Sequence, residues 1–210
     1  MNAALVIAVD GPAASGKGTI ARALGVHYGL PHLDTGRLYR AVGLAVLRQG
    51  SDPRNAAAAE RVAYAFDETF LADPDLACEE AGAAASIVAA IPAVRAALLA
   101  RQHAFASRPE GAVIDGRDIG TIIAPHACAK LFVTAAPHVR AERRRAELRA
   151  VDIQQVLADI IARDARDVSR IDAPLAQAHD AALLDTSELA IDEAIRQAIA
   201  LVEARIGRAR

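Results

Sequence analysis

The chain has 210 residues, enough for one sizeable hydrophobic core with a small appended subdomain, and its formal net charge at pH 7 is -2. This balance gives no electrostatic reason to expect a nucleic-acid or membrane partner. The two cysteines, Cys78 and Cys128, lack CxxC spacing, and the six histidines form no HExxH or HxxxH pair. We therefore expect buried or free thiols in a reducing, cytoplasmic compartment and no transition metal held by the protein.

Apolar runs alternate with polar turns and helical patterns, which is typical of a parallel sheet flanked by helices. An apolar run at 3–9 has no basic segment before it and leads directly into the turn DGP, so it favours a buried strand over a signal peptide. In chain order, the apolar runs predict five strands, at 5–9, 30–33, 113–114, 130–134 and 182–184. The helical patterns predict six helices, at 17–28, 35–49, 93–107, 137–149, 153–170 and 191–205.

Two stretches in the middle of the chain are harder to interpret. Residues 52–85 mix a helical piece with Asp-Pro turns, and we expect them to form part of an inserted region on the substrate side. Residues 81–100 are about as long as a membrane span, but Pro92 and Arg95 interrupt them. We therefore expect buried helices of a water-soluble fold in this stretch.

The stretch GPAASGKGT (11–19) matches the GxxxxGK core of a phosphate-binding loop and lies between a predicted strand and a predicted helix. Glycines let backbone N–H groups converge on an anion, the helix start offers unpaired donors, and Lys17 adds a mobile positive charge. The usual motif continues with Ser or Thr as a magnesium ligand, whereas this chain has Gly18. We therefore expect magnesium to be held by nucleotide phosphates and waters, with Asp115 as the candidate protein ligand.

Two further motifs place polar residues where predicted strands end, and α/β folds bind ligands there. In DTGRLYR, Thr35 can cap a helix that carries Arg40, which makes a second anion site. In AVIDGRDIGT, Arg117 can bind phosphate and Asp118 can accept hydrogen bonds from a base amino group. The alternatives are a simple capped helix with a surface arginine and an internal Arg–Asp turn.

Two arginine-rich stretches also allow more than one interpretation. In RDARDVSR, Arg163, Asp167 and Arg170 fall at i, i+4 and i+7 on one helix face, and this spacing alone favours solvent-facing ion pairs. The stretch RAERRRAELR (140–149) is a solvated helix, a weak RNA patch or, beside a phosphate-binding loop, a lid over a triphosphate. We favour the lid because phosphoryl transfer needs positioned positive charge. The many arginines also favour an anionic acceptor over water.

Five pieces of the chain together resemble the bacterial cytidylate kinase family. They are GPAASGKGT, DTGRLYR, SIVAAIPAVRAALLARQ, IDGRDIGT and RDARDVSR followed by APL, in the family's order from residue 4 to about 190. The resemblance implies transfer of the γ-phosphoryl group of ATP, with Mg²⁺, to CMP or dCMP. It also implies one P-loop kinase domain over 1–210, with an α/β three-layer fold and a five-stranded parallel sheet. An acceptor-binding insert at about 35–107 and an arginine-rich lid at about 137–155 complete this expectation.

The resemblance also implies roles for individual residues. The ATP phosphates would be bound by Gly11, Pro12, Ala13, Ala14, Ser15, Gly16, Lys17, Gly18 and Thr19. Cytosine would be recognised by Ser86, Arg95 and Asp118, and the acceptor phosphate would be held by Thr35, Arg40 and Arg117. Arg163 and Asp167 would reach the ribose, and Arg170 would contact the nucleotide from the same helix. The residues expected to act in catalysis are Lys17, Arg117 and Arg163.

The chain departs from the family pattern in three places. Position 37 is Arg, where the family usually has a small or different residue, so we expect a different charge in the acceptor loop. The segment 66–82 is shorter than the family's inserted β-region, so we expect that small sheet to be reduced or missing, and the lid between 149 and 153 is trimmed. We expect a monomer. Two alternatives stay open: a P-loop kinase for UMP, AMP or a small metabolite, and a non-catalytic module that senses ATP or binds RNA through residues 140–149. The separate arginine motifs argue against the second, because a sensor needs no acceptor pocket.

Overall fold

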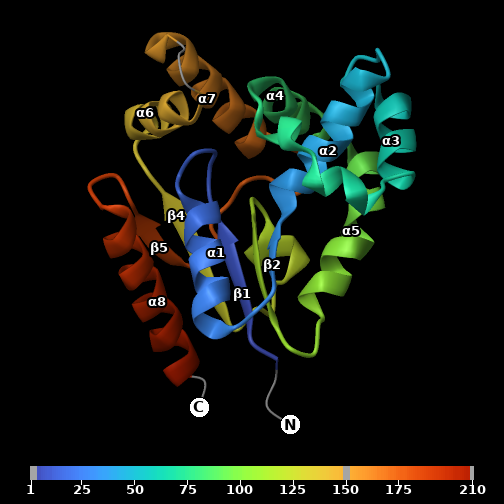
Figure 1. The fold of residues 1–210 in the computed structure, drawn as a ribbon. Helices are drawn as coiled ribbons and strands as arrows, with labels where there is room; N and C mark the ends of the chain where they lie inside the picture. The colour runs from blue at the N-terminus through green and yellow to red at the C-terminus, as the bar shows by residue number, and fades with distance from the viewer. Residues whose placement is uncertain (1–3, 149–151, 209–210) are drawn as a thin grey trace. The chain divides into compact units, whose positions relative to one another are not determined.

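The computed structural model describes residues 4–148 and 152–208, which form two compact units (Figure 1). The sheet unit comprises the chain up to Asp34 and from His103 onward, and the helical unit comprises Thr35–Gln102. The helical unit has bounds close to those of the predicted insert, about 35–107. The chain thus leaves the sheet unit once and returns to it once.

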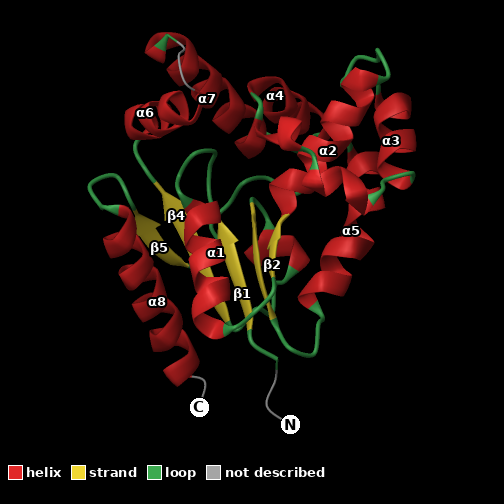
Figure 2. Cartoon of the chain, viewed as in Figure 1, coloured by secondary structure: helices red, strands yellow, loops and turns green. Residues whose placement is uncertain are grey.

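The sheet unit contains a parallel sheet with the strand order β2-β3-β1-β4-β5 (Figure 2). Its strands are β1 (Val6–Asp10), β2 (His32–Asp34), β3 (Ala112–Gly116), β4 (Ala129–Thr134) and β5 (Ala182–Asp185). Every pairing is parallel, and Val9 of β1 lies opposite Asp115 on one side and Leu131 on the other. The five predicted strands and the α/β fold class are therefore confirmed, with strand ends that differ from the prediction by one or two residues.

The two faces of this sheet have different neighbours, because successive side chains of a strand point to opposite faces. On one face, Ile7 and Val9 pack in a core with α1 (Lys17–Tyr28) and α8 (Ile191–Arg208). On the other face, β1 contacts η3 (Ile119–Ile123), a single π-helical turn that follows β3. Asp10 points to this second face and Asp115, which pairs in register with Val9, to the first.

Two helices of the sheet unit carry the arginine-rich stretches. They are α6 (Pro137–Leu148) and α7 (Ile153–Val168), and they pack together through Ala141, Val156 and Ile160. The prediction that the second helix extends to residue 170 is wrong, because α7 ends at Val168. The predicted helix end at 149 and the trimmed lid at 149–153 fall wholly or partly outside the described residues.

The helical unit contains α2 (Thr35–Arg48), α3 (Ala56–Tyr64), the 3₁₀ turns η1 (Glu68–Ala72) and η2 (Pro74–Ala77), and α4 (Glu79–Val88). Helix α5 (Pro92–Ala106) begins in this unit and ends in the sheet unit. Residues 66–82 contain helical turns and the start of α4 but no strand. The family's small sheet is therefore missing there, as predicted.

The apolar stretch at 81–100 forms two helices rather than one. In the part of the chain that the structure describes, no single helix is long and apolar enough to cross a membrane. Among the described helices, only α4 and α5 taken together meet that test, and they are bent by 100° at the break before Pro92. The helices pack into a core with α2 and α3, which confirms the prediction of buried helices.

Candidate active site

The phosphate-binding loop connects β1 to α1, and its backbone shape depends on glycine. Gly11 has a φ of +152°, and a Cβ on it would lie 2.0 Å from the carbonyl oxygen of Val133, so no other residue fits there. Gly16 precedes α1 with a φ of +87° and makes no side-chain cap. The first N–H groups of α1 have no partner within the helix and therefore form an anion-binding cradle.

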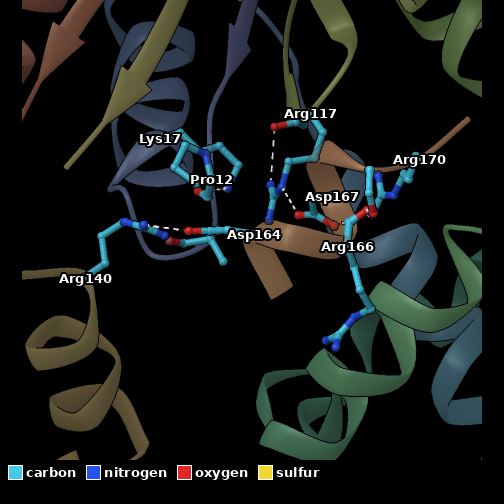
Figure 3. A network of polar contacts seen from close by, with 11 residues as sticks. Pro12, Lys17, Arg117, Arg140, Asp164, Arg166, Asp167 and Arg170 are labelled. Atoms are coloured by element: carbon cyan, nitrogen blue, oxygen red, sulfur yellow. Dashed lines mark hydrogen bonds and ion pairs between the residues drawn. The ribbon is translucent and has the colours of Figure 1, made fainter. Parts of the chain in front are cut away.

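Lys17, the first residue of α1, lies half-buried beside this cradle. Its Nζ is 3.5 Å from the carbonyl oxygen of Pro12 (Figure 3). Burial and then the positive charge of Arg117 lower the pKa of Lys17 to about 8, while the carboxylates of Asp115 and Asp34 oppose this shift. Arg117, which sequence reasoning placed at an acceptor phosphate, thus lies within electrostatic reach of the P-loop lysine.

Asp115 is buried at the end of β3 and faces α1. One of its oxygens, Oδ1, lies 2.7 Å from Nε2 of His32 on the neighbouring strand β2. The other, Oδ2, lies 3.8 Å from the point where a Cβ on Gly18 would be. Gly18 stands where the usual motif has a hydroxyl ligand, so the carboxylate of Asp115 approaches the space that such a side chain would use. Sequence reasoning considered histidines only as metal-ligand pairs and therefore missed His32.

A cluster of arginines surrounds Asp167, which is only 1% exposed (Figure 3). Nε of Arg117 donates to Asp167 Oδ2 at 2.8 Å, and Nη2 of Arg170 donates to Oδ1. Burial would raise the pKa of Asp167, but the charges of Arg117, Arg170 and Arg163 lower it below its ordinary value. The interpretation of this stretch as solvent-facing ion pairs is therefore wrong, because spacing on a helix does not tell which face is buried.

The arginines of α6 divide into two kinds. Arg140 is buried and donates to the carbonyl oxygens of Ala135 and Ala13, at 2.8 and 3.2 Å, and to Asp164 at 2.6 Å. Arg143 donates to the hydroxyl and carbonyl oxygens of Thr186, at 2.9 and 2.7 Å.

The next two arginines, Arg144 and Arg145, instead pair with the exposed carboxylates of Glu147 and Glu142 on the same helix. The first half of α6 is thus tied to the phosphate-binding loop and to the loop after β5, and the second half carries ion pairs within the helix. This geometry does not fit a wholly solvated helix.

A pocket of about 320 Å³ adjoins the phosphate-binding loop within the sheet unit. Its lining includes Gly16, Thr19, Arg143, Thr186, Leu189 and Ala194. The apolar side chains suit a flat ring, and the loop glycine at one end suits phosphate. The sequence predicted the phosphate-binding residues 11–19 and an arginine-rich lid that contains Arg143. It named no pocket residue after β5 or on α8, because Thr186, Leu189 and Ala194 belong to no motif.

Asp10 is a further polar residue of the site that sequence reasoning missed. It is 4% exposed, and its Oδ1 and Oδ2 accept the backbone N–H groups of Ile119 and Gly120, at 2.8 and 2.7 Å. These residues directly follow Asp118, the predicted base-recognising residue, which is itself buried. A carboxylate at the end of an otherwise apolar run was the available signal for this role.

The other predicted acceptor residues belong to the helical unit. Thr35 is buried and is the first residue of α2 rather than the residue before it. Arg40 donates to the carbonyl oxygens of Leu76 and Cys78, at 2.8 and 3.2 Å.

On α4 and α5, Ser86 is buried and the guanidinium of Arg95 lies 5.8 Å from the ring centre of Tyr39. The structure thus brings Arg117, Asp167 and Arg170 together, with Arg117 and Arg163 within electrostatic reach of Lys17. It places Thr35, Arg40, Ser86 and Arg95 within the helical unit. The roles of all these residues stay predictions.

Comparison with known proteins places these motifs in a family. The family model for cytidylate kinase matches residues 7–204. A cytidylate kinase of Xanthobacter autotrophicus is 60% identical over 205 residues, which cover 96% of this chain and 98% of that protein. A cytidylate kinase of Caulobacter vibrioides is 57% identical over 202 residues, covering 94% of this chain and 95% of that protein.

Solved structures agree on the fold at much lower sequence identity. A gluconokinase from Sinorhizobium meliloti aligns with a TM-score of 0.57 at 15% identity, covering 98% of this chain and 95% of the other. An uncharacterized protein from Eubacterium ventriosum aligns with a TM-score of 0.58 at 15% identity, covering 95% and 99%. These two structures show that the chain shares their fold. Its family is shown by the more similar relatives above.

Proposed function

Since the chain belongs to the cytidylate kinase family and is therefore a phosphotransferase, we propose that it transfers the γ-phosphoryl group of ATP, bound with Mg²⁺, to the phosphate of CMP or dCMP. The observation that carries this proposal is the shared environment of Lys17 and Arg117. Arg117, held by Asp167, and Lys17 lie in the same region of polar side chains (Figure 3), and the charges of Arg117 and Arg163 both lower the pKa of Lys17. Three positive groups so close together suit two phosphates that must meet in line.

The donor nucleotide is assigned to the sheet unit. The cradle at 11–19 takes the ATP phosphates, and the adjoining pocket, with Thr186 and Leu189 in its lining, takes the nucleoside. The buried hydroxyl of Ser15 supports this assignment. It has no hydrogen-bond partner in the described part of the chain, and such an atom often marks a place that a ligand completes.

The residues present also fit a magnesium ion next to these phosphates. Oδ2 of Asp115 faces the space beside Gly18, and a carboxylate oxygen is the ligand type that Mg²⁺ prefers. We assign Asp115 as the protein group that would hold the ion, directly or through water. Magnesium neutralises charge on the β- and γ-phosphates when it is bound.

In the sheet unit, Arg117 is assigned to the acceptor phosphate and Asp118 to the cytosine amino group. Other residues for which the family resemblance implies acceptor binding belong to the helical unit, namely Thr35, Arg40, Ser86 and Arg95. Asp167 supports Arg117, because its buried carboxylate fixes the direction of the guanidinium before any substrate arrives. In the reaction, an oxygen of the acceptor phosphate forms a bond to the γ-phosphorus while the bond to the oxygen of departing ADP breaks.

ADP formation from ATP and Mg²⁺, measured with CMP, dCMP, UMP, AMP, GMP or no acceptor, tests this function. We expect turnover with CMP and dCMP only. Turnover with another acceptor alone would identify a different P-loop kinase, and ATP binding without any acceptor-dependent turnover would identify a nucleotide-sensing module. The proposal includes a monomeric, cytoplasmic enzyme without nucleic-acid or membrane partners. Sedimentation of the purified chain, with and without CMP, tests whether it is a monomer.

Two variants connect this assay to the assigned residues. Lys17→Ala should lower kcat by about a hundredfold or more, because it removes a charge that stabilises the transferred phosphoryl group. The exposed Arg54, which pairs with Asp52, gives the matched charge control Arg54→Ala, which should leave kcat unchanged.

Asp118→Ala should lower kcat/KM for CMP by a factor that corresponds to about 1–3 kcal/mol, because the base loses a hydrogen-bond partner. The exposed Asp159 supplies the control Asp159→Ala.

A further inference from the structure

The carboxylate of Asp10 sits between two functional segments of the sheet unit. It is the last residue of β1, so Gly11 of the phosphate-binding loop follows it directly. Its side chain points to the opposite face of the sheet from Asp115 and toward η3. The two aspartates, at the ends of neighbouring strands, therefore face different parts of the site.

Both oxygens of Asp10 are used by the backbone of η3. The N–H of Ile119 donates to Oδ1 at 2.8 Å and the N–H of Gly120 donates to Oδ2 at 2.7 Å. A Cβ on Gly120 would lie 3.1 Å from Cδ of Lys130 and 3.3 Å from Oδ2 of Asp10, so the absence of a side chain permits the close approach. The ionised carboxylate accepts both N–H groups in charge-assisted hydrogen bonds, and a proton on either oxygen weakens the bond that this oxygen accepts.

These hydrogen bonds fix the backbone directly after Asp118. The carbonyl oxygen of Asp118 accepts the N–H groups of Ile122 and Ile123 from the same turn, at 2.9 and 3.2 Å. Asp118 itself is not helical, with φ −139° and ψ 23°, so η3 does not hold its conformation by helical bonding alone. The direction of its side chain thus depends on both anchors.

We propose that ionised Asp10 is a positioning residue for acceptor recognition, which fixes Ile119 and Gly120 and through them the side chain of Asp118, so that affinity for the acceptor nucleotide falls when Asp10 takes up a proton. The proposal rests on the proposed function, in which Asp118 recognises the base. It differs from the roles assigned above because both oxygens of Asp10 are bound to the backbone of η3, so Asp10 acts through Asp118.

The charges around Asp10 support a transition near neutral pH. Burial raises the pKa of Asp10 to about 7, the two backbone hydrogen bonds oppose this, the negative charge of Asp118 raises it and the positive charge of Arg117 lowers it. From β4, Lys130 also approaches η3, but its Nζ donates to Asp180 at 3.0 Å and to the carbonyl oxygen of Pro125 at 2.6 Å. Lys130 thus pairs with other groups, so it does little to offset the effect of burial on the pKa of Asp10.

The test compares the wild-type chain with Asp10→Asn, an isosteric change that turns one acceptor toward η3 into a donor. KM values for CMP and for ATP are measured between pH 5.5 and 8.5. At pH 8 the variant should raise KM for CMP by about five- to tenfold, because one buried N–H loses its acceptor, and should change KM for ATP by less than about twofold. Asp192→Asn, the same change on an exposed aspartate of α8, should leave both values unchanged.

The pH profile separates positioning from a general structural loss. The phosphate of CMP itself titrates near pH 6, so the informative quantity is the ratio of KM for CMP between the variant and the wild type. This ratio should fall toward one as the pH drops from 8 to 6, because the wild type then loses its ionised Asp10 as well. A ratio that stays constant with pH, or an equal rise in KM for ATP, would overturn the proposal.

A second measurement does not depend on turnover or on the variant's folding. In wild-type protein, the NMR signal of the Gly120 amide should shift with a midpoint near pH 7, because its acceptor changes charge. A Gly120 signal that does not move between pH 5.5 and 8.5 would overturn the proposal. Wild-type protein that turns over no acceptor at any pH would instead overturn the proposed function. The Gly120 titration would still show whether Asp10 changes its charge at this hydrogen bond.

Discussion

Asp115 presents its two carboxylate oxygens to different partners. Oδ1 contacts His32 on β2, and Oδ2 faces the space beside Gly18. The contact with His32 prevents the carboxylate from rotating, so it sets the direction of the oxygen that is assigned to magnesium. His32, on a neighbouring strand, thus helps to orient the proposed magnesium ligand. In the usual motif, a hydroxyl of the phosphate-binding loop is itself a ligand.

We predict that His32→Ala raises the Mg²⁺ concentration needed for half-maximal activity by about tenfold, because partners that orient a metal-ligating carboxylate contribute strongly to metal affinity. Activity is titrated with Mg²⁺ at a fixed ATP concentration, and kcat at saturating Mg²⁺ should largely recover. The exposed His126 supplies the control His126→Ala. A variant with lowered kcat and an unchanged Mg²⁺ requirement would contradict the role of His32.

The buried carboxylate of Asp10 should also be visible in protein stability. The folded protein keeps a proton on Asp10 up to about pH 7, whereas the unfolded chain releases it near 3.8. Between these values the folded state binds more protons, so this residue makes the free energy of unfolding decrease as the pH rises, by at most about 1.4 kcal/mol per pH unit.

We therefore predict that the free energy of unfolding of Asp10→Asn, relative to wild type, increases from pH 5 to pH 7 and levels off above. Urea unfolding at pH 5, 6, 7 and 8 measures it, and the many groups common to both proteins cancel in the difference. Parallel stability profiles for the two proteins would show that Asp10 has an ordinary pKa.

Single residues were predictable where a motif fixed their chemistry, as for Lys17. Asp10 and His32 were not, because each acquires its role from a partner more than 80 positions away in the sequence. The burial of Asp167 could not be predicted either, since its partner Arg117 comes from the loop after β3. Such pairings depend on strand order, which no local sequence pattern specifies.

At the level of the helices, α2 and α4 pack most closely at Gly43. A Cβ on this glycine would lie 2.8 Å from Cβ of Ala84 and 2.9 Å from its carbonyl carbon. Real Cβ atoms do not approach other atoms so closely, so the glycine permits this helix contact. Arg40 and Ser86, which lie on these two helices, depend on the same contact for their relative positions.

We predict that Gly43→Ala destabilises the protein by about 1–2 kcal/mol, because overpacking of about 1–3 kcal/mol outweighs a gain in helix propensity of less than about 1 kcal/mol. A Cβ on Gly207 of α8 would meet no atom of the described residues within 4 Å, so Gly207→Ala is the matched control and should be neutral or slightly stabilising. Thermal unfolding of both variants checks this, and a stabilised Gly43→Ala would show that α2 and α4 can move apart at no cost.

The helices and strands that the sequence predicted well are those with clear apolar contrast between turns. Helix α1 begins and ends where predicted, at Lys17 and Tyr28. Helices α3 and α4 were not delimited, because their alanine-rich sequences show little difference between a buried and an exposed face. The π-helical turn η3 was also missed, since its bonds to Asp10 come from another strand.

At the scale of the whole molecule, each of the two units has a hydrophobic core of its own. One belongs to the helical unit and includes Leu98, and the other belongs to the sheet unit and includes Leu131. Both side chains are almost completely buried. The chain passes between the units at Asp34–Thr35 and at Gln102–His103, so loss of packing in one core need not open the other.

We predict that Leu98→Ala, which costs about 2–5 kcal/mol in a buried site, accelerates amide hydrogen exchange in α2 and α4 and leaves exchange in β1 and β3 unchanged. Leu131→Ala should accelerate exchange in the sheet instead. Hydrogen exchange followed by mass spectrometry resolves both units. Equal acceleration throughout the chain would show that the two units unfold as one.

The arginines of α6 have a consequence for how nucleotides reach the protein. Arg140 and Arg143 are satisfied by oxygen atoms of the sheet unit, and Arg144 and Arg145 by glutamates of their own helix. Hydrogen bonds to the neutral oxygens of Thr186 do not cancel the positive charge of Arg143, which lines the pocket beside the phosphate-binding loop. This charge attracts an anionic nucleotide over a distance that salt screening shortens, so the rate of nucleotide capture should fall as ionic strength rises.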